Sequence, residues 1–525
     1  MLHSTEILTT AQMRAIESAA IQRGRVSGSV MMERAGVAVV DAILAEWPEY
    51  AQPRPDFPWR ATVLCGPGNN GGDGFVVARL LAQKGWEMTV LFYGEADQLP
   101  PDARHHHDKW CETGSIWPLT LDVQQHFKAD VLIDALFGIG LSRSVDAFCR
   151  LFDDMYAAVN NIFGNERSPT IDRLVAVDVP SFLCASSGRM MLKDGSPWLT
   201  YDLTVTFHLP KTGHLIGDGP ELCGKLVVAD LNIPGGPARD PSERTDKASV
   251  RQDQLRKIPF DHKYGHGHAL VLAGNSGRGG AARLSARSAL RIGAGLVTIC
   301  PPRLALTEHA GPPDALMRRA MDDAAALQAA LDDKRITAIC LGPGAGIERA
   351  AALLPALLAA GRRSVLDADA LTALAASQDI SAALHDGCVL TPHAGEFARL
   401  FPDLAERLDA PPLRGPAYSK LDATREAAAR CGAAVLLKGP DTVIAAPDGQ
   451  AIIHSAFDVP WLATAGSGDV LAGFITGLLA RGLPPLQAAA TGAWLHAAAA
   501  RRFGPGLIAD DLPDEIPGVF RDLGL

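Results

Sequence analysis

One arrangement occurs twice in this chain of 525 residues: a short apolar strand runs into a glycine-rich turn, which leads into a helix. The first copy has a strand at 61–65, a turn at 66–74 and a helix that we predict to begin at Phe75. The second copy has a strand at 269–273 and a turn at 274–282. This order of elements is typical of the nucleotide-binding unit of α/β folds. Because the chain is too long for one ordinary core, the repetition predicts two α/β domains.

Further short apolar segments follow each copy, and helices are predicted between them. The predicted strands lie at 88–92, 130–134, 174–178, 203–207 and 226–229 in the first half, and at 296–300, 336–341, 365–367, 389–391 and 434–437 in the second. Strands that alternate with helices form parallel sheets. Residues 236–250 are rich in proline, glycine and charge, so we predict a linker there between domains at 1–235 and 251–525.

The composition excludes several classes of protein. The formal net charge is −10, and lysine and arginine are spread along the chain, which argues against a nucleic-acid partner. No window is long and apolar enough to span a membrane, and the N-terminus has no apolar run of signal-peptide length. The nine cysteines are widely spaced without a CxxC motif, which argues against zinc ribbons and a disulfide scaffold. We therefore expect a cytoplasmic protein with no membrane partner.

Charged and amide side chains follow the strands of the first half. Asp134 and Asp178 each end a predicted strand, Lys211 follows another, and residues 69–73 occupy the first glycine turn. Ligands bind at the carboxyl edge of an open parallel sheet, where these side chains would meet, and a lysine facing an aspartate is an acid/base pair. Simpler interpretations stay open: a strand-end Asp can cap the next helix, a Lys can be solvated, and Asn and Gly can form an ordinary turn.

In the second half, a turn of small residues at 464–468 runs directly into an apolar segment that we predict to be a helix ending near Ala480. Backbone N–H groups at such a helix start bind anions. A carboxylate there, Asp469, would repel a phosphate unless it takes a proton from an attacking hydroxyl; the alternative is a helix cap. Four more loops follow strands at the same predicted edge, which favours a site for a nucleotide and an acceptor. They are 342–346, 367–370, 391–396 and 438–442.

A run of three histidines, His105, His106 and His107, could suggest a metal site. Adjacent side chains on a solvated loop rarely converge on one ion. We therefore interpret the run as an exposed loop rather than a metal site.

Taken together, these motifs resemble one family, the bifunctional NAD(P)H-hydrate repair enzymes, across nearly the whole chain. In the first domain the resemblance rests on GNNGGDG at 68–74, DALFGIG at 134–140, DVPS at 178–181 and Lys211 in LPKTG. In the second it rests on residues 280–282 and on GPGAG, DADAL, TPHAGE, KGPDT and AGSGDVLAG. It implies an N-terminal NAD(P)H-hydrate epimerase domain with a Rossmann-like three-layer α/β/α fold. The C-terminal domain would be an ADP-dependent NAD(P)H-hydrate dehydratase with a ribokinase-like α/β/α fold.

For the first domain, the resemblance implies a site for the hydrated nicotinamide nucleotide and a potassium ion. Asp178 and Lys211 would be the acid and base at the hydrated ring carbon, where the R and S forms interconvert. Potassium would be coordinated by Asn70, Asp134 and Ser181. The hydrate would be held by Asn69, Asn70, Gly71, Gly72, Asp73, Gly138, Ile139, Gly140, Leu141, Ser142, Arg143, Ser144 and Asp178.

For the second domain, the resemblance implies a site for ADP, magnesium and the hydrate, with Asp469 as the base. Phosphorylation of the hydrate's hydroxyl makes it a good leaving group, and elimination would give NAD(P)H, AMP and phosphate. The implied small-molecule partners are the hydrates NADHX and NADPHX and ADP, and we expect a homo-oligomer. The hydrate would contact Ala281, Gly344, His393 and Asp469, and ADP would contact Lys438, Gly439, Pro440, Asp441, Thr442 and Gly468.

The chain departs from the family pattern at two places. The usual GTGD is GSGD at 466–469, where serine keeps the hydroxyl. The usual Pro-Ser-Gly-Leu is here Pro-Ser-Phe-Leu at 180–183, and residues 184–187 lack the expected acidic side chain. We expect Phe182 to crowd this loop or to change its backbone.

Two other functions fit parts of the sequence. The glycine turn before Asp469 also fits an ATP-dependent kinase of a vitamin or sugar, fused to a non-catalytic nucleotide-binding module. A kinase would release a phosphorylated product, whereas a dehydratase would release NADH as ADP is consumed. Gly66, Gly68 and Gly71 match the G-x-G-x-x-G pattern of an NAD dehydrogenase, but no second strand ends in the expected acid at a convincing position.

Overall fold

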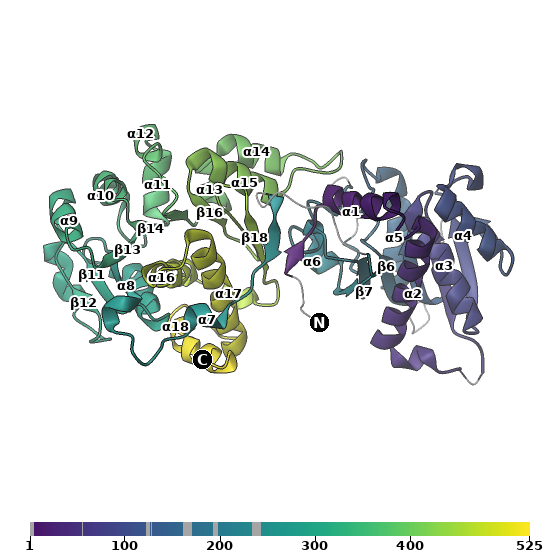
Figure 1. Ribbon diagram of the computed structural model, residues 1–525, viewed down its shortest axis with the longest axis horizontal. Coiled ribbons are helices and arrows are strands. Elements are labelled where there is room, and N and C mark those ends of the chain that lie inside the picture. The colour runs from purple at the N-terminus through teal and green to yellow at the C-terminus, as the bar shows by residue number, and fades with distance from the viewer. Residues whose placement is uncertain are drawn as a thin grey trace. The chain divides into compact units, whose positions relative to one another are not determined.

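The computed structural model describes residues 5–54, 56–121, 127, 129–160, 171–192, 198–233 and 243–525. The chain divides into two compact units (Figure 1): residues 1–239 with 411–419, and residues 240–410 with 420–525. Residues 411–419 therefore pack with the first unit although they lie far from it in the sequence. The range predicted as a linker contains a strand of the second unit at Thr245–Lys247, and its residues 236–242 lie outside the described residues.

The first unit is an α/β fold on a parallel sheet with the strand order β4-β3-β2-β5-β6-β7-β8. The order reverses between β2 and β5, because the chain builds outward from β2 to β4 and then returns. The unit's strands are β1 (Glu6–Ile7), β2 (Arg60–Cys65), β3 (Glu87–Phe92), β4 (Ile116–Pro118), β5 (Ala129–Ala135), β6 (Ile171–Val177), β7 (Leu203–Phe207) and β8 (Lys225–Ala229). Its helices are α1 (Thr10–Gln22), α2 (Gly28–Glu46), α3 (Asn69–Gln83), α4 (Pro101–Cys111), α5 (Cys149–Val159) and α6 (Gly219–Leu222).

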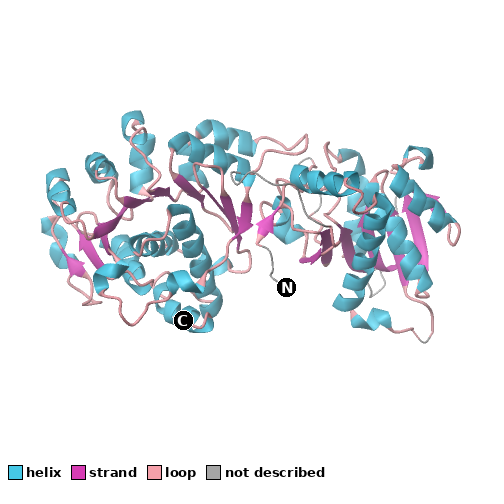
Figure 2. Ribbon diagram, viewed as in Figure 1, coloured by secondary structure: helices cyan, strands magenta, loops and turns pink. Residues whose placement is uncertain are grey.

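Helices cover both faces of this sheet (Figure 2). Val63 and Val131 belong to the core that contains residues of α1, α2, α3 and α4, whereas Leu64 and Leu132 belong to the core that contains residues of α5. Successive side chains of a strand point to opposite faces, so continuous apolar strands supply a core on each side. The predicted three-layer α/β/α fold is confirmed.

The second unit is also an α/β fold, with the strand order β9-β18-β17-β16-β15-β14-β13-β10-β11-β12. Its neighbouring strands are parallel except for β17, which runs antiparallel to β16 and to β18. The strands are β9 (Thr245–Lys247), β10 (His268–Leu272), β11 (Leu296–Cys300), β12 (Met317–Arg318), β13 (Ile336–Leu341), β14 (Arg363–Leu366), β15 (Cys388–Leu390), β16 (Ala434–Leu437), β17 (Asp441–Ala445) and β18 (Ala451–Ser455). The helices are α7 (Gln252–Leu255), α8 (Gly279–Arg291), α9 (Ala324–Leu331), α10 (Ile347–Ala359), α11 (Asp369–Ala375), α12 (Gln378–Ser381), α13 (Ala394–Leu400), α14 (Pro402–Asp409), α15 (Lys420–Cys431), α16 (Ser467–Ala480), α17 (Pro485–Phe503) and α18 (Leu512–Asp522).

Helix α16 lies at the centre of the second unit's larger core. Every residue of α16 from Val470 to Ala480 is buried, and it packs with residues of α8, α17 and α18 against one face of the sheet (Figure 1). A helix that is apolar on all sides is a core helix, as the sequence of this segment indicates. Its N-terminal end is thereby fixed at the carboxyl edge of the sheet.

Two predictions about helices in the first unit are wrong. Helix α3 begins at Asn69, not at Phe75, so the predicted glycine loop forms its first turns. The histidine run is not an exposed loop: it lies in α4, where His106 and His107 are buried and His106 Nε2 is 3.0 Å from the Ser29 hydroxyl.

No helix of the described residues is long and apolar enough to cross a membrane. The nine cysteines are all free thiols.

Candidate functional site

The carboxyl ends of β2, β5, β6 and β7 form the edge of the first sheet that carries most of the predicted residues. The strand order reverses there between β2 and β5, and open α/β sheets bind ligands at such a point. Glycine lets α3 begin very close to this edge. A Cβ at Gly71 would lie 2.0 Å from the carbonyl oxygen of Gly66, and one at Gly72 would lie 2.5 Å from Sδ of Met32.

Asn70 and Asp178 approach the loop after β5 from two different elements. A Cβ on Gly138 would lie 3.0 Å from Asn70 Oδ1 and 3.3 Å from Asp178 Oδ2. Asn70 is buried, and its Nδ2 is without a hydrogen-bond partner in the described part of the chain. A buried, unpaired amide group beside a helix N-terminus can hold a polar ligand.

Asp178 follows β6 with a left-handed backbone, φ 67°. Its Oδ1 accepts hydrogen bonds from Thr206 Oγ1 at 2.8 Å and Lys211 Nζ at 3.2 Å, and its Oδ2 accepts one from the Ile139 amide at 3.4 Å. A positive φ is costly for a side chain of this kind and is concentrated at functional sites. The conformation aims the carboxylate between the loop after β5 and the end of β7.

Lys211 is only 1% exposed and makes three hydrogen bonds through Nζ. Besides Asp178, it donates to Thr206 Oγ1 at 2.8 Å and to the Phe207 carbonyl at 2.9 Å. Burial by itself would raise the pKa of Asp178, but the charges of Lys211 and His214 and the hydrogen bonds from Thr206 and Lys211 together hold that pKa below its usual value. The structure thus brings the two predicted acid/base residues into one ion pair.

Asp134 and Ser181 also meet. Ser181 donates to Asp134 through its hydroxyl at 2.5 Å and its amide at 3.1 Å, and the Tyr201 hydroxyl donates at 2.5 Å. Asp134 is fully buried, which raises its pKa despite these donors. Carboxylate, hydroxyl and amide oxygens at one sheet edge are a donor set that suits a hard cation.

The predicted hydrate-binding residues at 138–144 divide into three groups. Gly138 and Ile139 contact Asp178, as described above, whereas Gly140, Ser142 and Arg143 are exposed. Leu141 and Ser144 are partly buried between them.

Sequence reasoning missed Glu17 of α1. Burial, followed by the charge of Asp178, raises the pKa of Glu17 to about 7, while Lys211 opposes the rise. Burial, Asp178 and Glu17 together raise the pKa of Asp73 well above its usual value. These carboxylates therefore belong to the Asp178–Lys211 cluster. Nothing in the sequence distinguishes Glu17 from a solvated glutamate on an amphipathic helix.

Phe182 does not crowd the site as expected. Its side chain is 1% exposed and packs edge-on against Phe152 at 5.1 Å, with Tyr201 at 6.1 Å on another side. The ring fills the core beneath α5, and Ser181 keeps its hydrogen bonds to Asp134. The departure from glycine is accommodated by packing.

In the second unit, the buried Asp367 and the partly buried Lys438 form an ion pair at the carboxyl edge of the sheet. Lys438 Nζ donates to Asp367 Oδ1 at 2.8 Å, and Thr391 Oγ1 donates to the same oxygen at 2.8 Å. Glu396 lies 3.7 Å from Nζ. Burial lowers the pKa of Lys438, but Asp367 and Glu396 raise it above its usual value, so the ammonium group stays charged.

Asp469 lies in the first turn of α16, three residues after the left-handed N-cap Gly466 (φ 87°). Burial and the nearby Asp367 raise the pKa of Asp469 to about 6, although Lys438 opposes them. Ser285 Oγ holds the Asp469 carbonyl at 2.8 Å. A carboxylate with a pKa near neutral, at a helix N-terminus, can take up and release a proton.

The predicted hydrate contacts of the second unit lie on three loops. Gly344 and Ala281 are adjacent, because a Cβ on Gly344 would lie 3.4 Å from the Ala281 Cβ. His393 caps α13 through Nδ1, which accepts from the Gly395 amide at 3.0 Å, and more than half of its side chain is exposed. Glu396 connects it to Lys438, at 3.6 Å from His393 and 3.7 Å from Lys438.

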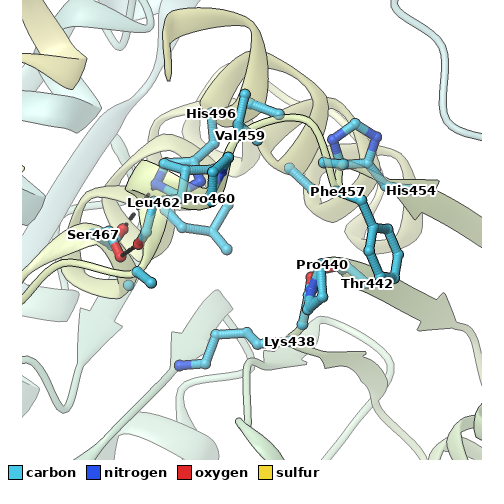
Figure 3. A pocket seen from close by; sticks show the side chains of 17 residues that line it. Lys438, Pro440, Thr442, His454, Phe457, Val459, Pro460, Leu462, Ser467 and His496 are labelled. Atoms are coloured by element: carbon cyan, nitrogen blue, oxygen red, sulfur yellow. Dashed lines mark hydrogen bonds between the residues drawn. The ribbon is translucent and has the colours of Figure 1, made fainter. Parts of the chain in front are cut away.

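A cavity of about 520 Å³ opens beside this edge (Figure 3). Five of the six predicted ADP contacts line it: Lys438, Gly439, Pro440, Thr442 and Gly468. The sixth, Asp441, pairs with Lys420 at 2.6 Å. The rest of the wall is mostly apolar and was not predicted; it includes His454, Phe457, Val459, Leu462, Leu471 and His496. An apolar cavity with a few polar groups at one end fits a base with attached phosphates.

The fold and the two candidate sites are those of a two-domain α/β enzyme. The family model described as "NAD(P)H-hydrate dehydratase" matches residues 269–516, and the one described as "YjeF-related protein N-terminus" matches residues 28–213. The chain belongs to the family of bifunctional NAD(P)H-hydrate repair enzymes.

Relatives match over nearly the full length of the chain. The bifunctional NAD(P)H-hydrate repair enzyme of Moorella thermoacetica is 35% identical over 98% of this chain and 97% of its own, and that of Coxiella burnetii is 33% identical over 97% and 98%. The NAD(P)H-hydrate epimerase of Rhodobacter capsulatus is 45% identical over 40% of this chain and 92% of its own. Among solved structures, an ADP/ATP-dependent NAD(P)H-hydrate dehydratase from Bacillus subtilis is 28% identical, with a TM-score of 0.43 over 51% of this chain and 94% of its own.

Proposed function

We propose that this chain repairs hydrated nicotinamide nucleotides in two steps. The first unit interconverts the R and S forms of NADHX and NADPHX. The second unit uses ADP to dehydrate the S form, giving NAD(P)H, AMP and phosphate. The proposal is supported chiefly by the full-length relatives that bear this name. The ion pairs Asp178–Lys211 and Asp367–Lys438, each at the carboxyl edge of a sheet, are consistent with it.

In the second unit, Asp469 is the base for the substrate hydroxyl. Its pKa of about 6 leaves it mostly ionised at neutral pH, yet able to hold the proton that it removes. The amides at the start of α16 and the Lys438 ammonium group face the same place and stabilise negative charge on a phosphoryl group. The hydroxyl's oxygen then leaves as phosphate, and loss of a ring proton restores the double bond.

ADP binds in the 520 Å³ cavity, with its phosphates toward Lys438 and Gly468. Magnesium, when bound, neutralises phosphate charge. Among the described residues no three His, Cys, Asp or Glu side chains gather into a metal cage. Magnesium held mainly by phosphates needs only one or two protein carboxylates, for which Asp367 is a candidate.

In the first unit, Asp178 and Lys211 act at the hydrated ring carbon. Inversion of this carbon requires the hydroxyl to leave one face as water and water to return to the other face, so one proton is supplied and one is removed. Lys211 is positioned to donate and the ionised Asp178 to accept. Asn70 Oδ1, the Asp134 carboxylate and the Ser181 hydroxyl would hold potassium, because they are oxygen ligands that meet at this sheet edge.

The test is incubation of the purified protein with mixed R and S hydrate, ADP and magnesium, while the absorbance of the reduced nicotinamide ring is followed. Full conversion is expected. A stop at the S fraction would show that only the second unit acts, and a phosphorylated product without NADH would identify a kinase instead.

We propose that the protein acts in the cytoplasm. Free cysteines persist in a reducing compartment, and all nine cysteines of the chain are free thiols. We also expect a homo-oligomer, which light scattering on the purified chain would test.

A further inference from the structure

Residues 411–419, which we call the brace, connect α14 and α15 of the second unit in the sequence. In space they belong to the first unit. The brace therefore carries a piece of the C-terminal half of the sequence into the unit that holds Asp178 and Lys211. What it contacts there indicates its role.

One end of the brace lies against the loop at 138–144. The Gly415 amide donates to the Ser142 carbonyl at 3.1 Å, and Arg414 forms an antiparallel bridge with Arg143. The approach is so close that a Cβ on Gly415 would lie 2.5 Å from the Leu141 carbonyl oxygen and 3.2 Å from the Ser142 Cα. Only glycine fits here without moving the loop.

The other end of the brace is buried behind the same loop. Ala417 is 5% exposed and forms a small apolar cluster with Cys184 and Met191, against which Leu141 packs. The Ala417 amide donates to Cys184 Sγ at 3.4 Å. The Met191 carbonyl in turn accepts from the Val145 amide at 2.9 Å. The brace thus fills the space between the loop at 138–144 and the segment that follows Ser181.

These contacts matter because the loop reaches the reacting groups directly. The Ile139 amide donates to Asp178 Oδ2, and Gly138 lies against Asp178 and Asn70. The loop's outer residues Gly140, Ser142 and Arg143 are exposed and are not held by the core. The brace holds two of them, through the Gly415–Ser142 hydrogen bond and the bridge from Arg414 to Arg143. Binding residues on loops need such a supporting layer to hold their geometry.

We propose that the brace is a positioning element of the first unit's site: it holds the loop at 138–144 in the conformation that binds the hydrated nucleotide. This inference rests on the proposed epimerase function. It assigns no chemical step to the brace, which contacts the loop and not the Asp178 carboxylate. Cys184 supports the brace, because its side chain contacts Ala417.

The test uses the full-length protein and measures both activities in each variant. Gly415→Ala pushes a methyl group against the loop, and Ala417→Asp places a charge in the buried cluster. Each has a matched control. Leu413→Asp puts the same charge on an exposed side chain of the brace, 56% exposed, and Gly311→Ala adds the same methyl group where nothing lies within 4 Å.

The two brace variants are expected to raise the KM for the R hydrate in epimerisation by about fivefold to a hundredfold, with kcat changed less than about twofold. Dehydratase kinetics on the S hydrate should match those of the wild type, which shows that the second unit is folded. The two controls should match the wild type in both activities.

The inference is overturned if both brace variants keep an unchanged KM for epimerisation, if only kcat falls, or if both activities fall together. A wild-type protein that dehydrates S hydrate but never converts R to S would instead overturn the epimerase function on which the inference rests. The two failures are therefore distinguishable.

Discussion

Asp178 and Asp469 occupy equivalent places, each at the carboxyl edge of a parallel sheet, but their surroundings have opposite effects. Burial would raise the pKa of Asp178, but Lys211, which donates directly to it, and His214 and Thr206 together hold that pKa below the usual value. Asp469 is partly buried and lies near two other carboxylates, Asp367 and Asp369, so burial first and these charges second raise its pKa to about 6. One aspartate is therefore fully ionised at neutral pH, while the other titrates close to it.

This difference predicts the pH dependence of the dehydratase. Because the base must be deprotonated, kcat/KM should fall about tenfold for each pH unit below about 6. Asp367→Asn removes a neighbouring negative charge and frees Lys438, and both effects lower the pKa of Asp469. The acid limb of the profile should then move to lower pH. An unchanged limb, or a move to higher pH, would contradict the assignment of Asp469 as the base.

A second prediction concerns stability at Asp134. Tyr201→Phe removes a donor from a fully buried carboxylate and should lower the free energy of unfolding of the first unit by about 1–3 kcal/mol. Urea unfolding, followed by circular dichroism and by loss of epimerase activity, measures the change. Tyr264→Phe is the control, because the Tyr264 hydroxyl accepts from Arg335 on an exposed surface and should cost almost nothing.

The site residues that the sequence could identify share one property: they follow predicted strands within recognisable motifs. Asp134, Asp178, Lys211 and Asp469 are of this kind. Glu17 and His454 belong to no such motif. Glu17 lies on the amphipathic helix α1, and His454 lies on the hairpin strand β18. Their proximity to the sites depends on tertiary packing, which a local pattern does not contain.

At the scale of elements, strands were easier to predict than helix starts. Helix α3 begins within Asn-Asn-Gly-Gly-Asp, a sequence of low helix propensity, because tight packing against Gly66 and Met32 compensates. In α4, the buried residues Ala103, His106, His107 and Trp110 follow helical spacing. That periodicity was available in the sequence, but the composition of the histidine run obscured it.

The packing of α16 on α8 gives a third prediction. A Cβ at Gly473 would lie 2.2 Å from the Ser285 carbonyl oxygen and 2.6 Å from the Ser288 Cβ. Gly473→Ala should therefore push the two helices apart, destabilise the second unit by about 1–3 kcal/mol and lower dehydratase activity, since α16 carries Asp469. Epimerase activity should be unchanged. Thermal unfolding and both assays test this, and a variant with full dehydratase activity would refute it.

For the whole molecule, the division into two units predicts that the activities can be separated. Asp178→Asn should stop conversion at the S fraction, and Asp469→Asn should abolish NADH release, with a loss of about 10²–10⁴ in kcat. Because the epimers are small and diffusible, an equimolar mixture of the two variants should again convert all the hydrate. A mixture that stops at the S fraction would show that substrate must pass within one chain.

The presence of two α/β domains was predictable from the repeated strand, turn and helix, but the brace was not. Residues 411–419 and 138–144 are separated by more than half of the chain, and neither segment has a periodic pattern. Contacts between such segments depend on the tertiary structure, which local sequence patterns do not contain.

The glycines at the start of α3 have a consequence for comparisons among related chains. Gly66, Gly71 and Gly72 are each excluded from bearing a side chain by atoms 1.8–2.5 Å away from where a Cβ would lie. A related protein without any catalytic activity would still need these three glycines in order to fold. The presence of these glycines in a related chain therefore indicates that the fold is kept, not that the chain is active. A related chain that has lost activity is better recognised by changes at Asp178 or Lys211.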